Sequence, residues 1–402
     1  MHYIWTELFI LFLTIFVAKI LAKKTNTVDV LWYIVLGAVL GNLHILSEDH
    51  RIEFLGEIGI ILVMFALGFE ENLSNFLKGV KKAWGIAIIG AIFPFLAGFL
   101  SAKFFGFSTN SALIWGLTMT ATAVSLTMVS LKSLGLEKTP AATGIMTSAV
   151  VDDVLSLIGV AVLLPIILSG NTQNGNLVVD FEKLMNTFFD VLAFFGFVYL
   201  VGKFIVPHKK GIRYLFIVDR GNYAVLGVFI LVFLFGDVAH ILGFHPAIGA
   251  YFAGLILKAE YFEVGNQNRA KEIEKITNTM AFTVFGPVFF ILLGGKIIFE
   301  PHILKEVIIP TLTLFVLVLV FQVLSAAFAA KYTGGYSSKD SWLIGFGMLG
   351  RAELAFIVLN ITYVQNHLIS QEEFYTLMFV TFLLNISVPL LLKWYKPIYE
   401  SE

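Results

Sequence analysis

The stretch TPAATGIMTSAVVDDVLSLIGVAVLLPIIL, residues 139–168, decides the fold class of this chain. It is long and apolar enough to cross a bilayer, since a helix of ~20 residues spans the ~30 Å hydrocarbon layer. Asp152 and Asp153 nevertheless lie at its middle, where one carboxylate costs at least ~2.5–3.5 kcal/mol to insert. Adjacent acids also repel each other when both are ionised. The pair therefore indicates that a proton or a cation compensates the charge, which favours ion transport.

The composition of the whole chain agrees with a membrane protein. Of its 402 residues 58% are hydrophobic and only 14% are charged, and the mean hydropathy is +0.87, whereas soluble domains carry ~25% charged residues. The net charge of -1 gives no reason to expect a nucleic-acid partner. The absence of cysteine excludes thiolate metal sites and cysteine nucleophiles. No nucleotide fingerprint, metal motif or nucleophile–base set is present, so we expect neither a cofactor nor an enzyme.

About thirteen apolar runs are long enough to form membrane-spanning helices. They lie near residues 1–21, 28–45, 54–70, 83–105, 111–132, 140–168, 184–206, 219–236, 240–257, 277–299, 306–330, 341–363 and 372–394. The first run has its basic residues after the apolar stretch, unlike a signal peptide, so we interpret it as a retained span. The sequence thus predicts an all-α polytopic protein.

Basic residues gather in the loops that follow the odd-numbered runs. They are Lys23, Lys24, Lys78, Lys81, Lys82, Lys132, Lys138, Lys209, Lys210, Arg213, Lys258, Arg269, Lys271, Lys275, Lys331, Lys339, Lys393 and Lys396. Because basic loops stay in the cytoplasm, the pattern predicts an outside N-terminus and a cytoplasmic C-terminus.

Thirteen runs whose connecting loops alternate between basic and non-basic can be divided into a unit of six runs, a single run and a second unit of six runs. The expected organisation is one membrane domain over residues 1–402, with a first repeat at 1–168, a linker helix at 184–206 and a second repeat of inverted topology at 219–394, an arrangement common in secondary transporters. Topology alone supports the repeat, since no residue-level repeat is evident. We expect no soluble regulatory domain.

Two runs are expected to form discontinuous helices. The fifth run has a hydroxyl-rich centre that includes Thr120, Thr122 and Ser125, and such side chains can satisfy backbone groups where a membrane helix unwinds. The twelfth run has three glycines followed by Arg351 and Glu353. Broken helices at corresponding positions of two repeats mark a transporter binding site, although small residues also serve helix packing.

The candidate ion-binding residues are Asp152, Asp153, Thr122 and Ser148. Ser148 lies four residues before Asp152 and so on the same helix face. Carboxylate and hydroxyl oxygens suit a hard monovalent cation, and a buried carboxylate can hold either a proton or a cation. That competition is sufficient for antiport. The alternative is a structural ion pair with Arg351.

Five segments together resemble the monovalent cation:proton antiporters, in the branch of the Kef-type and bacterial sodium/proton antiporters. They are TATAVSLT (120–127), TSAVVDDVLSL (147–157), GFHPAIGAYFAGLIL (243–257), FGPVFFILLGG (285–295) and GRAELAFIV (350–358). The resemblance implies a thirteen-span fold with a dimer domain, a mobile core domain and two crossed, broken helices. It also implies elevator-like alternating access, with Asp153 as the ion-binding and proton-carrying carboxylate, Asp152 as its neighbour and Thr122 at the helix crossing.

Three residues are candidate modulators. Gln322 takes the place at which many members with an Asp pair carry a lysine that partners the first Asp. Glu70 matches an acid common in the family, and a solvated helix end is its other interpretation. His245 could sense pH, or could simply pack at the kinked entry to its run.

The sequence therefore predicts a homodimeric antiporter of the bacterial inner membrane that exchanges Na+ or Li+ for H+ and serves pH homeostasis. Its partners would be the transported ions and membrane lipid. A K+/H+ antiporter of Kef type is the first alternative, and a channel or uniporter without proton coupling is the second.

Overall fold

The computed structural model describes residues 4–25, 27–46, 50–71, 73–120, 122, 126–127, 130–131, 134–136, 138–169, 171–173, 176–178, 181–207, 213–218, 222–264, 267–298, 301–351 and 353–400. Some side chains within these ranges lie outside the description as well, among them those of Glu70, Asp153 and Glu353.

The first part of the chain is almost wholly helical. Its helices are α1 (Ile4–Thr25), α2 (Asp29–Asn42), α3 (His50–Glu71), α4 (Leu73–Phe104), α5 (Thr109–Thr118) and α7 (Pro140–Ser169). A short hairpin of β1 (Asn171–Gln173) and β2 (Asn176–Val178) follows α7. Next comes α8 (Phe181–Leu200), which continues into the π-helical turn η1 (Val201–Ile205).

The second part of the chain is also almost wholly helical. Its helices are α9 (Arg213–Ile217), α10 (Ala224–Ile241), α11 (Pro246–Leu255), η3 (Ala259–Phe262), α12 (Ala270–Thr279), η4 (Met280–Phe285), α13 (Gly286–Gly295), α14 (Pro301–Tyr332), α15 (Ser338–Gly347), α16 (Glu353–Leu359), η5 (Asn360–Gln365) and α17 (Gln371–Glu400). The hairpin of β3 (Glu263–Val264) and β4 (Gln267–Asn268) is the other pair of short strands in the described chain.

Seven helices of the described chain are long and apolar enough to cross a membrane. The other expected runs coincide with shorter or interrupted helices, such as α2, α11 and the α15–α16–η5 segment. The all-helical, multi-pass architecture predicted from the sequence is therefore confirmed, while the count of thirteen spans stays a prediction.

Close helix packing depends on glycines. A Cβ at Gly37 or Gly41 of α2 would come within 2.2–2.3 Å of a carbonyl oxygen of α13, and a Cβ at Gly294 of α13 would meet the Ile34 carbonyl of α2 at 2.2 Å. Small residues of this kind let membrane helices approach closely where no hydrophobic effect draws them together. They hold α2 and α13 in contact.

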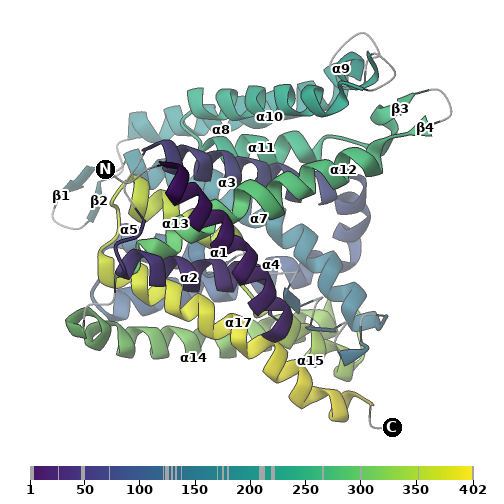
Figure 1. Ribbon diagram of the computed structural model, residues 1–402. Coiled ribbons are helices and arrows are strands. Elements are labelled where there is room, and N and C mark those ends of the chain that lie inside the picture. Colours follow the sequence, from purple (N-terminus) through teal and green to yellow (C-terminus); the bar gives the residue numbers. More distant parts are fainter. Residues whose placement is uncertain are drawn as a thin grey trace.

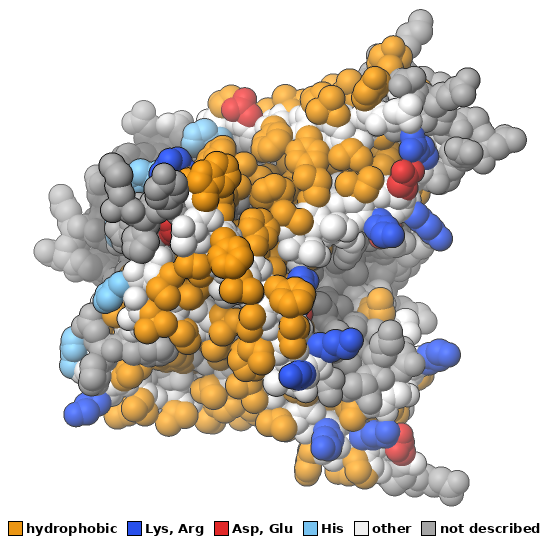
Figure 2. Space-filling model, viewed as in Figure 1, with side chains coloured by type: hydrophobic (Ala, Val, Ile, Leu, Met, Phe, Trp, Pro, Cys, Tyr) orange, Lys and Arg blue, Asp and Glu red, His pale blue; other side chains and the backbone are white. Residues whose placement is uncertain are grey.

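The long helices run side by side, and the two chain termini lie at opposite ends of the bundle (Figure 1). The face shown in Figure 2 carries a broad apolar band, with most Lys and Arg side chains at the end where the C-terminus lies. Large exposed apolar side chains such as Phe9, Ile309 and Leu390 would be unfavourable in water. In a bilayer the same band faces lipid.

Candidate functional site

The fifth run is interrupted at its centre. Helix α5 begins at the cap Ser108, whose Oγ accepts the Ser111 N–H (3.1 Å), and its regular geometry ends at Met119 (φ -88°, ψ 1°). The Thr120 hydroxyl donates to the Gly116 carbonyl oxygen at 2.8 Å. That bond satisfies a carbonyl of the last turn, as expected where a membrane helix stops. Thr122 follows in non-helical backbone.

The twelfth run is interrupted in the same manner. Helix α15 begins at the cap Ser337, whose Oγ accepts the Asp340 N–H (3.1 Å), and it ends at Met348 (φ -88°, ψ 9°) before α16 starts. The two interrupted helices touch directly, because the Thr127 hydroxyl donates to the Gly347 carbonyl oxygen at 2.6 Å. This contact joins segments that are 220 residues apart in the chain.

Asp152 lies at the first interruption. Its side chain is fully buried, and its Oδ2 accepts two hydrogen bonds from Thr122, one from the backbone N–H (3.1 Å) and one from the hydroxyl (2.7 Å). Its Oδ1 is equally buried and has no hydrogen-bond partner among the described atoms. Leaving a buried charged oxygen unsatisfied is unfavourable. One carboxylate oxygen is thus available to a proton or a cation.

Arg351 lies at the second interruption and is buried. Its Nη2 donates to Gln322 Oε1 (2.9 Å), and its Nη1 donates to the carbonyl oxygens of Gly350 (3.1 Å) and Met348 (3.4 Å). Its backbone N–H donates to Asn385 Oδ1 (2.7 Å), and Asn385 Nδ2 donates back to its carbonyl oxygen (2.9 Å). The guanidinium is thereby fixed in place by neutral groups.

In the described part of the structure Arg351 forms no direct ion pair with Asp152. Gln322, which the family resemblance places where many members carry a lysine, accepts a hydrogen bond from Arg351. No hydrogen bond joins it to Asp152 in the described structure. Ser148 is buried on the face of α7 that carries Asp152, and its hydroxyl donates to the Gly144 carbonyl oxygen at 2.7 Å. Its oxygen lone pairs stay available to a cation.

Several predicted site residues lie outside the description. They are Ser125 and the side chains of Asp153, Glu353 and Glu70. Their roles stay predictions.

A cavity of about 1320 Å³, with several titratable side chains in its lining, lies farther along α7 from Asp152. Its walls come from α2, α3, α7, α13, η5 and the turn between α10 and α11. Its charged and titratable lining residues are His44, His50, Glu53, Glu57, His240, His245, Lys296 and His367. Val160 and Leu164 of α7 also line it, at a distance along the helix of ~12 Å or more from Asp152 at 1.5 Å per residue. The described lining of this cavity does not include Asp152, Thr122 or Ser148.

His245 has a defined structural role at this cavity. It caps α11, with Nδ1 accepting the Ala247 N–H at 3.2 Å, and its Nε2 lies 3.3 Å from Gln365 Nε2. Helix capping and cavity lining thus account for its position.

The family model described as "Sodium/hydrogen exchanger, transmembrane" matches residues 12–395, which is nearly the whole chain. The chain belongs to the sodium/hydrogen exchanger family. The resemblance seen in its motifs is confirmed. The exchanger is a multi-pass membrane protein and a monovalent cation/proton antiporter, and its family is one of transporters and not of enzymes.

Curated relatives extend over most of the exchanger. The "Na(+)/H(+) antiporter" of Enterococcus hirae is 27% identical over 386 residues, 95% of each chain. The "Na(+)/H(+)-K(+) antiporter GerN" of Bacillus cereus is 28% identical and covers 93% of this chain and 91% of its own. The "K(+)/H(+) antiporter subunit KhtU" of Bacillus subtilis is 25% identical over 86% of this chain and 82% of its own.

Among solved structures, the sodium proton antiporter MjNhaP1 from Methanocaldococcus jannaschii at pH 8 matches with a TM-score of 0.69. It covers 98% of each chain at 17% identity. The exchanger therefore shares the fold of that protein.

Two residues of the site were not identified from the sequence. Asn385 is the single side-chain amide within the run 372–394, and a buried amide in an apolar run is a signal that could have been used. Thr127 closes the crossing, but it looks like any threonine in a membrane helix.

Proposed function

We propose that the exchanger carries Na+ in exchange for H+ by alternating access, with competition at the acid pair Asp152–Asp153. The observation that carries this proposal is the buried Asp152 carboxylate at an interrupted helix, with one oxygen bound to Thr122 and the other unpartnered. A cation and a proton can each neutralise such a group, and the two exclude each other. Binding one ion then requires release of the other.

The ligand set follows from the neighbouring oxygens. Asp153 carries the exchanged ion, as the family resemblance implies, and Asp152 supplies its unpartnered Oδ1. The Thr122 hydroxyl gives its hydrogen to Asp152, so its lone pairs are free to face a cation, as are those of Ser148. Water completes the shell. The carbonyl end of α5 adds partial negative charge at the site, and Arg351 balances the acids from its fixed position.

Matching helix lengths support the inverted repeat at 1–168 and 219–394, with the linker at 184–206. Helices α4, α5 and α7 have 32, 10 and 30 residues, and α14, α15 and α17 have 32, 10 and 30 as well. Packing follows the same order, since α4 contacts α5 and α7 while α14 contacts α15 and α17. Helices α4 and α14 also pack against each other. We assign these six helices to the mobile core domain of a homodimer.

The charge distribution supports an outside N-terminus and a cytoplasmic C-terminus. Most Lys and Arg side chains on the face in Figure 2 gather at the end that holds the C-terminus and the β3–β4 hairpin in Figure 1. Basic residues mark the cytoplasmic side of a membrane protein. The histidine-lined cavity then opens to the outside of the cell membrane.

For the transported ion, two adjacent carboxylates favour Na+, because a strong anionic field suits the smaller cation. K+/H+ exchange is the second candidate, since relatives named for K+ transport align with most of the chain. A channel or uniporter with the same acids would move cations without moving protons.

The test is proton flux in proteoliposomes that contain a pH-sensitive dye, with Na+, Li+, K+ or choline added in turn. We expect Na+ and Li+ to change the internal pH, and we expect Asp153→Asn to abolish the change while the protein stays folded. A response to K+ alone would make the exchanger a K+/H+ antiporter. Cation uptake with no pH change, or full activity of Asp153→Asn, would overturn the proposal.

A further inference from the structure

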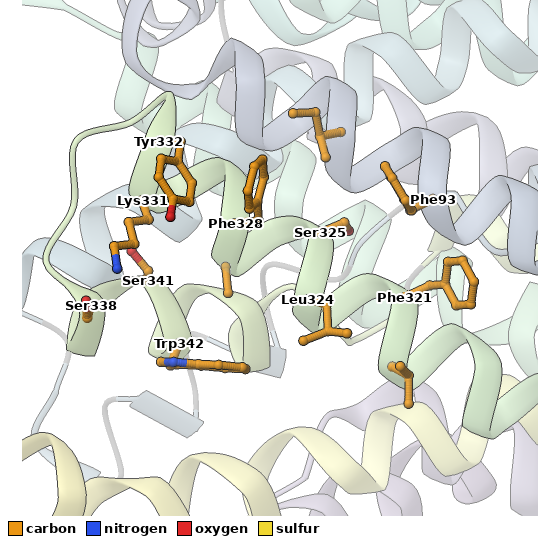
Figure 3. Close-up of a pocket in the computed structure, with 13 residues that line it drawn as sticks. Phe93, Phe321, Leu324, Ser325, Phe328, Lys331, Tyr332, Ser338, Ser341 and Trp342 are labelled. Atoms are coloured by element: carbon orange, nitrogen blue, oxygen red, sulfur yellow. The ribbon is translucent and has the colours of Figure 1, made fainter.

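An apolar groove with a volume of about 660 Å³ lies between α4, α14 and α15 (Figure 3). None of its described lining residues is a proposed ion ligand. Its walls are built mainly from aromatic and branched side chains, including Phe93 of α4, Leu324 and Phe328 of α14 and Trp342 of α15. Leu324 and Phe328 are 52% and 57% exposed. The groove is therefore part of the lipid-facing surface and has the size of a small-molecule site, ~300–1,000 Å³.

One end of the groove is cationic and polar. Lys331, in the last turn of α14, lines it together with Ser338 and Ser341 of α15 (Figure 3). None of its described lining residues is acidic. The nearby Asp340 is engaged elsewhere, because it accepts hydrogen bonds from Ser337 and Tyr399. The positive charge of Lys331 is thus left to attract an anion.

We propose that this groove binds a phospholipid with an anionic headgroup, its acyl chain along α14 and its phosphate at Lys331. Apolar walls that end in a lysine and two hydroxyls match the two parts of such a molecule. Basic pockets between membrane helices on the cytoplasmic side bind anionic headgroups, and aromatic rings such as Tyr332 and Trp342 mark the headgroup level.

One wall of the groove is linked through hydrogen bonds of α14 to Arg351. Ser325 lines the groove and its hydroxyl donates to the Gln322 carbonyl oxygen at 3.1 Å, while the Gln322 side chain binds Arg351 at 2.9 Å. A bound acyl chain therefore packs against the helix that positions Arg351. The proposed lipid site lies on the lipid-facing surface of the proposed core domain and is separate from the site of the transported ions.

Trp342 makes the proposal measurable, because bromine on an acyl chain quenches tryptophan fluorescence only at contact. The full-length exchanger would be placed in vesicles of brominated phosphatidylglycerol diluted with plain phosphatidylcholine, and in vesicles with the bromine on phosphatidylcholine instead. Subtracting the Trp342→Phe signal isolates this residue from the other five tryptophans. We expect half-maximal quenching at about a fivefold lower mole fraction of phosphatidylglycerol, the factor for one lysine near an anionic surface.

Matched variants separate a built site from ordinary lipid contact. Lys331→Gln should remove the preference, whereas Lys339→Gln, at a lysine in the first turn of α15 outside the described groove lining, should keep it. Leu324→Phe fills the groove and should weaken the quenching, whereas Leu312→Phe, equally exposed on the same helix at 53%, should not.

Equal quenching by the two lipids in the unmodified protein would overturn the proposal, since it would mean bulk bilayer contact only. An equal loss of preference in both lysine variants would overturn it as well, as would quenching that depends on the protein-to-lipid ratio, which would indicate a second copy of the chain in the groove.

Discussion

Helix α5 ends at Met119, and the N–H of Thr122, three residues later, donates to the Asp152 carboxylate. Helix α15 ends at Met348, and the N–H of Arg351, three residues later, donates to the Asn385 side-chain oxygen. The corresponding residues are separated by one constant interval of 229 residues, from 119 to 348 and from 122 to 351. The two interruptions share a backbone design and differ in the charge of the side chains that complete it.

The interruption after α5, which we call the aspartate half, and the interruption after α15, the arginine half, differ in their capacity to exchange an ion. Asn385 is neutral and uses both its oxygen and its nitrogen on Arg351. Asp152 is acidic and uses one oxygen on Thr122, which leaves the other without a partner. Arg351 Nε and Gln322 Nε2 are also buried without a hydrogen-bond partner among the described atoms, but both are donors and can hold neither a cation nor a further proton. The unpartnered Asp152 Oδ1 is an acceptor, so the aspartate half has capacity for a proton or a cation.

The largest effect is expected from making the acidic half resemble the neutral one. Asp152→Asn keeps an oxygen that accepts the Thr122 N–H but removes the negative charge. Mutation of a residue that supports a metal ligand lowers metal affinity by ~10–100-fold. For a proposed ligand we expect at least that loss in apparent Na+ affinity, measured from cation-dependent pH changes in proteoliposomes. Asp237→Asn, at an exposed helix end, is the control and should behave as the unmodified protein.

The next largest effect is a loss of stability on substitution of Arg351. Arg351→Lys keeps the charge but loses the rigid planar fork with which the guanidinium reaches Gln322 and two carbonyl oxygens. Because hydrogen bonds to charged groups contribute ~1.5–3 kcal/mol, we expect a decrease in stability of about that size, measured by thermal unfolding in detergent. Arg269→Lys, whose pair with Glu272 is partly exposed, should change stability by less than ~1 kcal/mol. Equal effects of the two variants would remove the special role of Arg351.

We expect a somewhat smaller loss of stability from a substitution of Asn385, the neutral side chain that binds the Arg351 backbone. Asn385→Ala removes both hydrogen bonds to the Arg351 backbone, and leaving buried backbone groups unsatisfied costs ~1–3 kcal/mol. Ser387→Ala removes only a hydroxyl that donates to the Leu383 carbonyl oxygen of its own helix and should be nearly neutral. Thermal unfolding of the two variants measures the difference, and an unaffected Asn385→Ala would show that the Asn385 hydrogen bonds are dispensable.

The smallest effect belongs to a single hydroxyl. Thr122→Val removes the 2.7 Å bond to Asp152 but keeps the backbone bond. Because the retained N–H bond still satisfies Asp152 Oδ2, we expect the loss of a typical hydrogen bond, ~0.5–1.5 kcal/mol, and a fall in apparent Na+ affinity of about two- to tenfold in the flux assay. Thr120→Val is the matched control, because the Thr120 hydroxyl bonds to the Gly116 carbonyl oxygen of the preceding helix α5 and not to Asp152. A larger loss in Thr120→Val than in Thr122→Val would contradict the assignment.

Much of this arrangement follows from the sequence because polar groups in apolar runs are conspicuous. The sequence places Asp152 and Thr122 at the middle of their apolar runs and Arg351 after three glycines, and the structure brings Thr122 to Asp152. The partner of Gln322 was not predicted, because a sequence does not specify which side chain an amide meets across a helix interface. The pairing of Arg351 with Asn385 and the histidine-lined cavity were missed for the same reason, since both join elements that are distant in the chain.

The central claim is that one cation and one proton compete for the same acids, and the apparent Na+ affinity as a function of pH tests it most directly. Initial exchange rates in proteoliposomes would be measured over a range of Na+ concentrations at several pH values, with equal pH on both sides at the start. Competition predicts that, in the acidic range, the Na+ concentration for half-maximal rate rises about tenfold per unit decrease in pH, while the maximal rate is reached again at high Na+. A half-maximal concentration that does not change with pH would contradict the account.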